Sequence, residues 1–464
     1  MKAFNQYSLT LIMVFFLFSG TEAQKQTPPA GGEPKDFKLP EKDSKKLGNG
    51  LTATLVQYGV IPKVDINVIV KTGNVHEGPD EVWLADLAGD LMGEGTTSMD
   101  FQTIAKKVAA MGGEVNISTG PNQTYISGSV LSEYAADLIA ILADILINPS
   151  FPESEIERLK NDLRRQLTVQ KSVPQSQALE KFRSIIYKDH AYGRVFPTAE
   201  MLDAYTLEKV KDFYEKNYGA RRTVVYAVGK FDEDEVGKAI EDAFGGWREG
   251  PVVDYPVATT TKTNEVAIID RTGAPQTTIM LGLPTLDPSQ PEYVPLSVTN
   301  SLLGGSFGSR ITSNIREDKG YTYSPRSVIN PGYRAAVWYE QADVTSEHTG
   351  ASLQEIAKEI KRLQTEPPAE EELKGIQNYE AGVFVLQNST PQGIISQLNF
   401  MDFHGLDESY LNDRVKKIHE VTPEKVRQMA QDYFRYEDMT LVLVGDKKQL
   451  EEQIKTHHEA LKVK

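Results

Sequence analysis

Runs of alternating apolar residues predict β-strands in both halves of this 464-residue chain. Residues 63–73, KVDINVIVKTG, carry a β-branched side chain at every second position, which is typical of a strand with one buried face. These side chains are Val64, Ile66, Val68 and Val70. Residues 115–131 predict a hairpin. Because runs of strands precede the helices, the pattern favours the α+β class, with mostly antiparallel sheets packed against helices.

The apolar period changes at residues 82–97, VWLADLAGDLMGEGTT, and predicts a short helix there. Its apolar face consists of Leu84, Leu87, Ala88 and Leu91. Asp86 and Asp90 lie one turn apart on a second face, where like charges cost about 0.2–0.5 kcal/mol. Gly89, in the helix interior, costs roughly another 1 kcal/mol. An acid, a glycine and an acid at positions i, i+3 and i+4 therefore need a reason other than helix stability.

Residues 206–229 and 422–445 repeat one another without a gap, at an offset of 216 residues. Each copy predicts a helix that begins at a threonine cap, followed by a strand that ends at glycine. The identical pairs are Thr206/Thr422, Glu208/Glu424, Lys209/Lys425, Val210/Val426, Val228/Val444 and Gly229/Gly445. Residues 149–160 and 365–374 form a second similar pair. We therefore predict an internal duplication.

Two homologous domains follow from this repeat. We expect the first domain at 44–247 and the second at 265–464. Residues 248–264 are rich in proline, valine and threonine and lack helical periodicity, so they are expected to form a linker.

The N-terminus has the pattern of a secretory signal peptide. Lys2 precedes an apolar run at residues 9–18, and small residues lead to an expected cleavage before Gln24. The run is too short to cross a bilayer, which takes about 20 apolar residues. We expect residues 1–23 to be the signal peptide and residues 24–43, rich in proline, glycine and lysine, to be a flexible tether.

The amino-acid composition argues against nucleic acids and anionic membranes as binding partners. The formal net charge is −15, whereas a nucleic-acid surface needs a basic stripe, and the same charge disfavours docking to an anionic membrane. No later stretch approaches a transmembrane length. The chain has no cysteine, which excludes disulfides and a cysteine-linked lipid anchor. We therefore expect a soluble exported protein, periplasmic or secreted, without nucleic acid and without a transmembrane segment.

Several motifs together resemble the pitrilysin/insulinase family of zinc metallopeptidases, and its mitochondrial-processing-peptidase-like branch in particular. They are the form LAxLxxxLMxxGT at the helix above, the pair Gly112 and Gly113, HAYGR at 190–194, and LLGGSFGSRITSNIREDKGYTYS at 302–324. The resemblance covers residues 45–460. It implies two homologous α/β domains that face each other across a cleft.

Active members of that family carry an inverted zinc motif, H-x-x-E-H, on the first helix, where two histidines bind zinc and the glutamate activates water. The resemblance places these positions at Asp86, Gly89 and Asp90. A distal glutamate is expected near residues 165–167, which are Arg, Gln and Leu. Two carboxylates suffice only for a weak hard-cation site completed by water. We therefore expect no metal in this chain and interpret the two aspartates as solvated acids that line a cavity.

In the second half, the resemblance assigns Arg316 and Tyr323 to contact the substrate backbone and the developing oxyanion across the cleft. The segment at 302–324 predicts a helix that holds Arg316 in its last turn, ends at Gly320 and leads into a short strand, so the two side chains can converge. Tyr321 is the alternative tyrosine. Without the resemblance, a surface arginine and a core tyrosine would explain the same residues.

Other candidate residues carry weaker arguments. Gly304 and Gly305 can let a substrate backbone or a neighbouring helix come close, and we include Asn116 among the substrate-binding residues. His190 is expected to shape a loop. The remaining histidines are expected at the surface: His76, His348, His404, His419, His457 and His458.

Three functions remain open at this point. The leading hypothesis is a non-catalytic subunit of an exported heteromeric zinc peptidase, in which a homologous partner subunit holds zinc and Arg316 and Tyr323 complete the site for a peptide substrate. The first alternative is a purely structural or peptide-binding protein derived from a peptidase. The second, a self-sufficient hydrolase with unusual ligands, is disfavoured by Asp86, Gly89 and Asp90.

Overall fold

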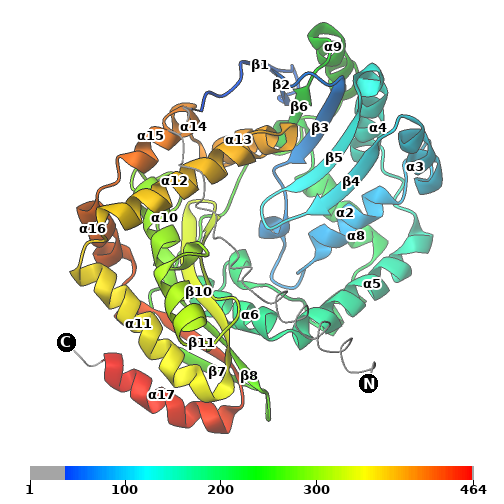
Figure 1. Cartoon of the computed structure of the whole chain (residues 1–464). Helices are drawn as coiled ribbons and strands as arrows, with labels where there is room; N and C mark the ends of the chain where they lie inside the picture. Colours follow the sequence, from blue (N-terminus) through cyan, green and yellow to red (C-terminus); the bar gives the residue numbers. More distant parts are fainter. Residues whose placement is uncertain (1–36, 462–464) are drawn as a thin grey trace, which may run out of the picture. The chain divides into compact units, whose positions relative to one another are not determined.

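The computed structural model describes residues 37–461, with side chains for residues 37–455. The expected signal peptide at 1–23 lies outside the described residues. The described residues, 37–461, belong to one compact unit that contains two β-sheets and the helices packed on them (Figure 1). Among the described helices, none combines the length and the apolar character needed to cross a bilayer.

The first sheet has six strands in the order β1-β2-β6-β3-β5-β4. The strands are β1 (Lys42–Lys46), β2 (Thr52–Gln57), β3 (Lys63–Val70), β4 (Glu114–Thr119), β5 (Thr124–Leu131) and β6 (Thr223–Gly229). Strands β2 and β6 are parallel, and the other neighbours are antiparallel. Strand β4 is an edge strand of this sheet.

The second sheet has five strands in the order β7-β11-β8-β10-β9. They are β7 (Val266–Asp270), β8 (Gln276–Thr285), β9 (Arg326–Gly332), β10 (Ala335–Thr345) and β11 (Thr440–Gly445). Strands β7 and β11 pair in parallel, as β2 and β6 do in the first sheet. The order β7-β11-β8-β10-β9 corresponds strand by strand to β2-β6-β3-β5-β4 of the first sheet, so the two halves repeat one topology.

The helices of the first half lie between β3 and the linker. They are α2 (Leu84–Gly93), α3 (Phe101–Ala110), α4 (Ala135–Ile147), α5 (Glu153–Ser172), α6 (Pro174–Tyr187), α7 (Ala199–Asp203), α8 (Leu207–Asn217) and α9 (Glu233–Phe244). The predicted apolar face of α2 is buried in the core of this half, because Leu84, Leu87 and Leu91 pack with the side chains of β3 and α4.

The second half has a matching set of helices and two irregular ones. The regular helices are α10 (Tyr293–Asn300), α11 (Thr349–Thr365), α12 (Glu370–Gln387), α13 (Pro391–His404), α14 (Ser409–Asn412), α15 (Arg414–His419), α16 (Pro423–Tyr433) and α17 (Lys447–Leu461). Two π-helical segments, Ser301–Gly305 and Thr312–Asp318, follow α10. Such wide turns are frequent at functional sites.

The sequence repeat corresponds to a structural repeat. Helices α8 and α16 both begin at a threonine, and each threonine Oγ1 accepts a hydrogen bond from the backbone N–H three residues later, at 3.3 Å for Thr206 and 3.2 Å for Thr422. Both helices lead to the parallel-paired strand of their sheet, β6 or β11.

Each half also covers part of the other half's sheet. Helix α6 shares an apolar cluster with β8, β10 and β11 of the second sheet. Helix α13 shares another with β2, β3 and β6 of the first. Buried members of these clusters include Phe182, Ile186, Met280 and Val444, and Ile69, Tyr226, Ile395 and Leu398. This reciprocal packing makes the halves interdependent.

The linker at 248–264 forms neither helix nor strand, and two histidines of the first half bind it. The His76 Nε2 atom lies 2.9 Å from the carbonyl oxygen of Asp254, and the His190 Nε2 atom lies 3.1 Å from that of Pro256. Between them, the buried ring of Tyr255 packs against rings of both halves. Its neighbours are His76, Tyr333 and Phe403.

The expectation that His404 lies at the surface is wrong. Its side chain is 2% exposed, in the last turn of α13. Burial lowers the pKa of its imidazole to about 4. Its ring packs against Phe400 and Phe403 of the same helix, and the charged groups that act on it, Asp287 and Arg334, are far from it in sequence.

Candidate functional site

Helix α2 begins beside two buried carboxyl groups. The Asn74 side-chain amide donates to Glu77 Oε1 at 3.0 Å and to Asp86 Oδ2 at 2.6 Å. The backbone N–H of Ala85 donates to Glu77 Oε1 at 2.9 Å, which satisfies one free donor of the first helical turn. Burial, and then the nearby Asp86, raise the pKa of Glu77 to about 8. Asp86 is thus part of the helix start, and burial raises its pKa as well.

Gly89 is required by packing. A Cβ at this position would lie 2.5 Å from Thr119 Oγ1 of β4. That hydroxyl donates to the carbonyl oxygen of Ala85 at 3.3 Å, so it is held against α2 by its own hydrogen bond. A side chain at position 89 would force Thr119 to rotate and lose this hydrogen bond, or would move β4 away from the helix. The sequence analysis explained this glycine only as a changed position of a metal motif, and the structure adds this steric reason.

A cavity of about 570 Å³ lies between α2, α3, α5 and the edge strand β4. Much of its wall is apolar, with contributions from Ile104, Val108, Ile117, Ile145 and Leu159. The acids that line it are Asp90, Glu94, Glu114 and Asp162. Asn116, on β4, lines the same cavity. The structure therefore brings the candidate residues Gly89, Asp90 and Asn116 together.

One arginine compensates much of this negative charge. Arg158 pairs with Glu94, and its Nη1 lies 3.2 Å from Asp162 Oδ2. Burial, and then the charges of Asp86, Glu94 and Asp162, raise the pKa of Asp90 to about 6, against the opposing effect of Arg158. The cavity therefore holds carboxyl groups that already have internal partners or raised pKa values.

The distal position of the implied zinc motif lies on α5. Arg165 and Gln166 are exposed there and Leu167 is buried. The acid of this helix that lines the cavity is Asp162, one turn before Gln166. The sequence analysis missed Asp162, although a spacing of four residues places it on the same helix face. Among the described residues, no three His, Asp or Glu side chains are grouped so that they could hold a metal ion.

In the second half, Arg316 and Tyr323 lie together. The guanidinium carbon of Arg316 is 5.0 Å from the centre of the Tyr323 ring and 4.4 Å from the centre of the Phe307 ring. Both rings face solvent, with 79% of Tyr323 and 69% of Phe307 exposed. The Arg316 Nε atom also lies 3.1 Å from a carboxylate oxygen of Glu317. The sequence analysis missed Phe307, whose signal is an aromatic residue among small ones in GGSFGS.

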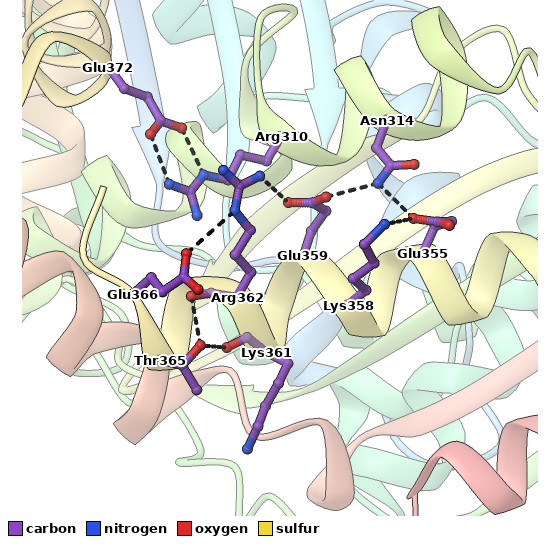
Figure 2. A network of polar contacts seen from close by, with 10 residues as sticks. All are labelled: Arg310, Asn314, Glu355, Lys358, Glu359, Lys361, Arg362, Thr365, Glu366 and Glu372. Atoms are coloured by element: carbon purple, nitrogen blue, oxygen red, sulfur yellow. Dashed lines mark hydrogen bonds and ion pairs between the residues drawn. The ribbon is translucent and has the colours of Figure 1, made fainter. Parts of the chain in front are cut away.

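A polar network joins Arg310 and Asn314 to helices α11 and α12 (Figure 2). Asn314 lies in the segment Thr312–Asp318, which also carries Arg316. Arg310 donates two hydrogen bonds to Glu372 of α12, at 2.7 and 2.8 Å. Asn314 donates to Glu355 and Glu359 of α11, at 2.8 Å each. Bidentate arginine–carboxylate pairs combine energy with geometric definition. The chain around Arg316 is therefore held in place by polar contacts to α11 and α12.

The nearby glycines pack against the chain itself. A Cβ on Gly304 would lie 2.7 Å from atoms of Ser327 and Glu340, and one on Gly305 would lie 2.5 Å from Asn300 Nδ2. The close approach that they permit is thus to their own half of the molecule, and a substrate-binding role for them stays a prediction.

Tyr321, the alternative to Tyr323, has a partner of its own. Its ring stacks on the ring of His348 with 4.4 Å between the centres. Tyr323 is therefore the more available of the two tyrosines. Arg316 and Tyr323 do not contribute to the α2 cavity, because every residue that lines this cavity belongs to the first half.

Comparisons with known proteins agree with this architecture. Residues 55–197 match the family model described as Insulinase (Peptidase family M16), and residues 204–379 match the one described as Peptidase M16 inactive domain. An uncharacterized zinc protease of Rickettsia bellii is 26% identical over 333 residues, which cover 70% of this chain and 79% of the relative. The uncharacterized zinc protease YmxG of Bacillus subtilis is 24% identical over 408 residues, covering 86% and 96%.

Solved structures show the same fold. The peptidase M16 inactive domain from Pseudomonas fluorescens superposes with a TM-score of 0.81 at 23% identity and covers 88% of this chain and 98% of its own. A protease from Helicobacter pylori gives 0.81 at 17% identity, covering 88% and 100%. The chain belongs to peptidase family M16. The predicted family and the α+β fold with two domains are confirmed, and the processing-peptidase-like branch stays a prediction.

Proposed function

We propose that this chain is a non-catalytic subunit of an exported heteromeric zinc peptidase. In this proposal a homologous partner subunit binds zinc, and this chain binds the peptide substrate and completes the partner's active site with Arg316 and Tyr323. Relatives described as zinc proteases supply the reaction class.

The observation that carries the proposal is the cluster of Phe307, Arg316 and Tyr323, in which the two rings are exposed and the arginine is half-buried. The half-buried guanidinium of Arg316 contacts two rings that are 69% and 79% exposed, and neighbouring residues Arg310 and Asn314 are held by polar contacts. Exposed apolar surface beside a fixed polar group is typical of a binding site. A fixed guanidinium and a phenol are hydrogen-bond donors of the kind that stabilise developing oxyanion charge. They would supply this stabilisation to a partner that holds the metal.

The first half supports the non-catalytic part of the proposal. Asp86 is engaged with Asn74, and Gly89 is fixed by Thr119. Neither residue offers a base next to a water molecule. The edge strand β4 and the adjoining cavity, with Asn116 at its wall, would instead accommodate an extended peptide by adding a strand to the sheet.

The test uses the complex with the zinc-bearing homologue from the same organism. Tyr323→Phe removes one hydroxyl and should leave assembly intact, while kcat/KM on a fluorogenic peptide falls roughly 10²–10³-fold, as for other lost oxyanion donors. Arg316→Ala should do comparable harm with a larger rise in KM. Asp86→Ala and Asp90→Ala should leave turnover nearly unchanged.

Unchanged turnover in assembled complexes of Tyr323→Phe and Arg316→Ala would defeat the proposal. The alternative, a structural or peptide-binding protein without a role in proteolysis, would then take its place. Zinc bound to the purified chain at about one ion per molecule, with chelator-sensitive cleavage, would support the self-sufficient hydrolase.

A further inference from the structure

Strand β7 is an edge strand of the second sheet, and its outer edge is unpaired. The equivalent strand of the first half is β2, whose outer edge pairs with the additional strand β1. In the described part of the chain, the second sheet has no counterpart of β1. The four central residues of β2 are buried, whereas no residue of β7 is fully buried. The duplication therefore leaves open in the second half a sheet edge that the first half covers.

The unpaired edge of β7 presents backbone N–H and carbonyl groups without partners. On the inner side, the carbonyl oxygen of Glu265 accepts from the N–H of Leu441 at 2.9 Å, and the N–H of Arg271 donates to the carbonyl oxygen of Gly445 at 2.7 Å. Because the hydrogen-bonding groups of successive residues alternate between the two sides of a strand, residues 265, 267, 269 and 271 face β11. Residues 266, 268 and 270 face outward, and their backbone groups make no hydrogen bond within the described part of the chain.

The side chains of β7 also differ from those of the covering strand β1. Every residue of β1 is exposed, and three of its five residues are lysines. Charged side chains, lysine above all, commonly prevent an edge strand from pairing with another chain. Strand β7 has four apolar residues in succession and no lysine. Val266 and Ile268 pack on the core of the second half, and Ala267 and Ile269 pack on the cluster that contains α6. Both faces of β7 are thus occupied within the chain, and its edge is suited to pairing with another strand.

We propose that the edge of β7 pairs, in antiparallel orientation, with the edge of β7 in a second copy of this chain. About a two-fold axis, Ile268 of one copy lies opposite Ile268 of the other, and Val266 lies opposite Asp270. This register pairs every outward-facing residue of the strand. It also joins the two second sheets into one continuous sheet.

The same register makes the two copies complementary in charge. It places Glu265 of each copy directly opposite Arg271 of the other, on the face of the sheet that α6 covers. Glu265 is exposed and Arg271 is half-exposed, and neither has an ion-pair partner among the described residues. Opposite charges at facing positions stabilise a strand pair, and like charges destabilise it. The sequence of β7 and its two flanking residues therefore favours a second copy as the occupant of this edge.

The test is sedimentation velocity of the purified chain over a range of micromolar concentrations at low salt, where surface charges are least screened. The wild type should form a dimer in proportion to its concentration. Glu265→Arg and Arg271→Glu each set like charges opposite one another at two positions, so each should raise the dimer dissociation constant about tenfold. The double variant Glu265→Arg/Arg271→Glu restores both pairs and should return to within about threefold of the wild type. Glu371→Arg, an equal change of charge at an exposed position of α12, is the matched control and should leave the dimer unchanged.

Hydrogen exchange distinguishes pairing at β7 from any other contact between two copies. Peptides that contain residues 266–270 should exchange more slowly when the wild type dimerises, and this protection should be lost in Glu265→Arg. The proposal is overturned by a wild type that stays monomeric, by a dimer that neither single variant weakens, or by a double variant that does not recover. Unchanged exchange at residues 266–270 in the dimer would overturn it as well. The proposed function fails separately, because its test depends on Arg316 and Tyr323, which β7 does not contain.

Discussion

The two halves of the molecule share one strand order but differ in the chemistry of the helical segment that follows their first antiparallel strand. In the first half, α2 carries acids that are compensated internally, by Asn74 for Asp86 and by Arg158 around Asp90. In the second half, the corresponding region holds the half-buried Arg316 against two exposed aromatic rings. The sheets thus provide a common frame, and the function of each half depends on a few residues in one segment.

The largest effect on this comparison should come from the brace of the second half. Glu372→Ala leaves the buried guanidinium of Arg310 without its bidentate partner. We expect a loss of about 2–3 kcal/mol in the free energy of unfolding, less than the 3–5 kcal/mol of a fully buried pair because Glu372 is partly exposed. Urea titration measures it, with exposed Glu371→Ala as the control. Equal effects of the two substitutions would mean that the network does not support the Arg316 segment.

Gly89 allows a similar test in the first half. Gly89→Ala places a methyl group against Thr119 and should cost about 1–3 kcal/mol, as overpacking does. Gly375→Ala is the matched control, because this glycine also lies within a helix but has open space around it. It should stabilise the protein by about 0.5–1 kcal/mol. A Gly89→Ala protein as stable as the Gly375→Ala protein would remove the packing explanation.

Glu77 should make the stability of the first half depend on pH. Its pKa rises from 4.5 to about 8 on folding, so the folded state holds a proton that the unfolded state loses between these values. Its contribution is full below about pH 4.5 and is lost as the pH rises to 8. Glu77→Gln keeps a neutral group there. The melting temperature of the variant relative to wild type should therefore increase from pH 5 to pH 8, and a constant difference would contradict the raised pKa.

Local patterns predicted the parts of the molecule that depend on neighbours in sequence. The 216-residue repeat indicated the duplicated topology, because Thr206 and Thr422 cap equivalent helices before equivalent strands. The approach of Arg316 to Tyr323 was predicted from a helix end and a short strand; the two side chains do meet, but Tyr323 lies in a bend before β9 and not in a strand. Neither prediction required knowledge of tertiary contacts.

Contacts across the fold were beyond such patterns. The close packing of Thr119 on Gly89, the burial of His404 and the exchange of α6 and α13 between the halves join residues that are far apart in sequence. The roles assigned to Arg316, Tyr323, Gly304, Gly305 and Asn116 also depend on a ligand, so they stay predictions.

His76 and His190 bind the linker, and their hydrogen bonds imply that its attachment to the first half weakens in acid. Each imidazole accepts a backbone N–H on Nδ1, from Gly73 to His76 at 3.3 Å and from Tyr192 to His190 at 3.2 Å. Both rings are therefore neutral, with the proton on Nε2 directed at a linker carbonyl. A second proton, on Nδ1, would place an imidazole N–H opposite the backbone N–H that now donates to this atom.

Burial, then Arg222, lowers the pKa of His76 to about 4, against the opposing charge of Asp254; burial, with Arg194, lowers that of His190. The unfolded chain thus binds more protons, and stability falls as the pH drops from about 6.5 towards 4. NMR titration should find both imidazoles as Nε2–H tautomers. In the same pH window, the linker amide of Thr261, which donates to the carbonyl oxygen of Ile186 at 3.1 Å, should lose protection against hydrogen exchange. Unchanged protection at pH 4.5 would contradict this. Protonation of His76 and His190 at low pH thus weakens the attachment of the linker that connects the two halves.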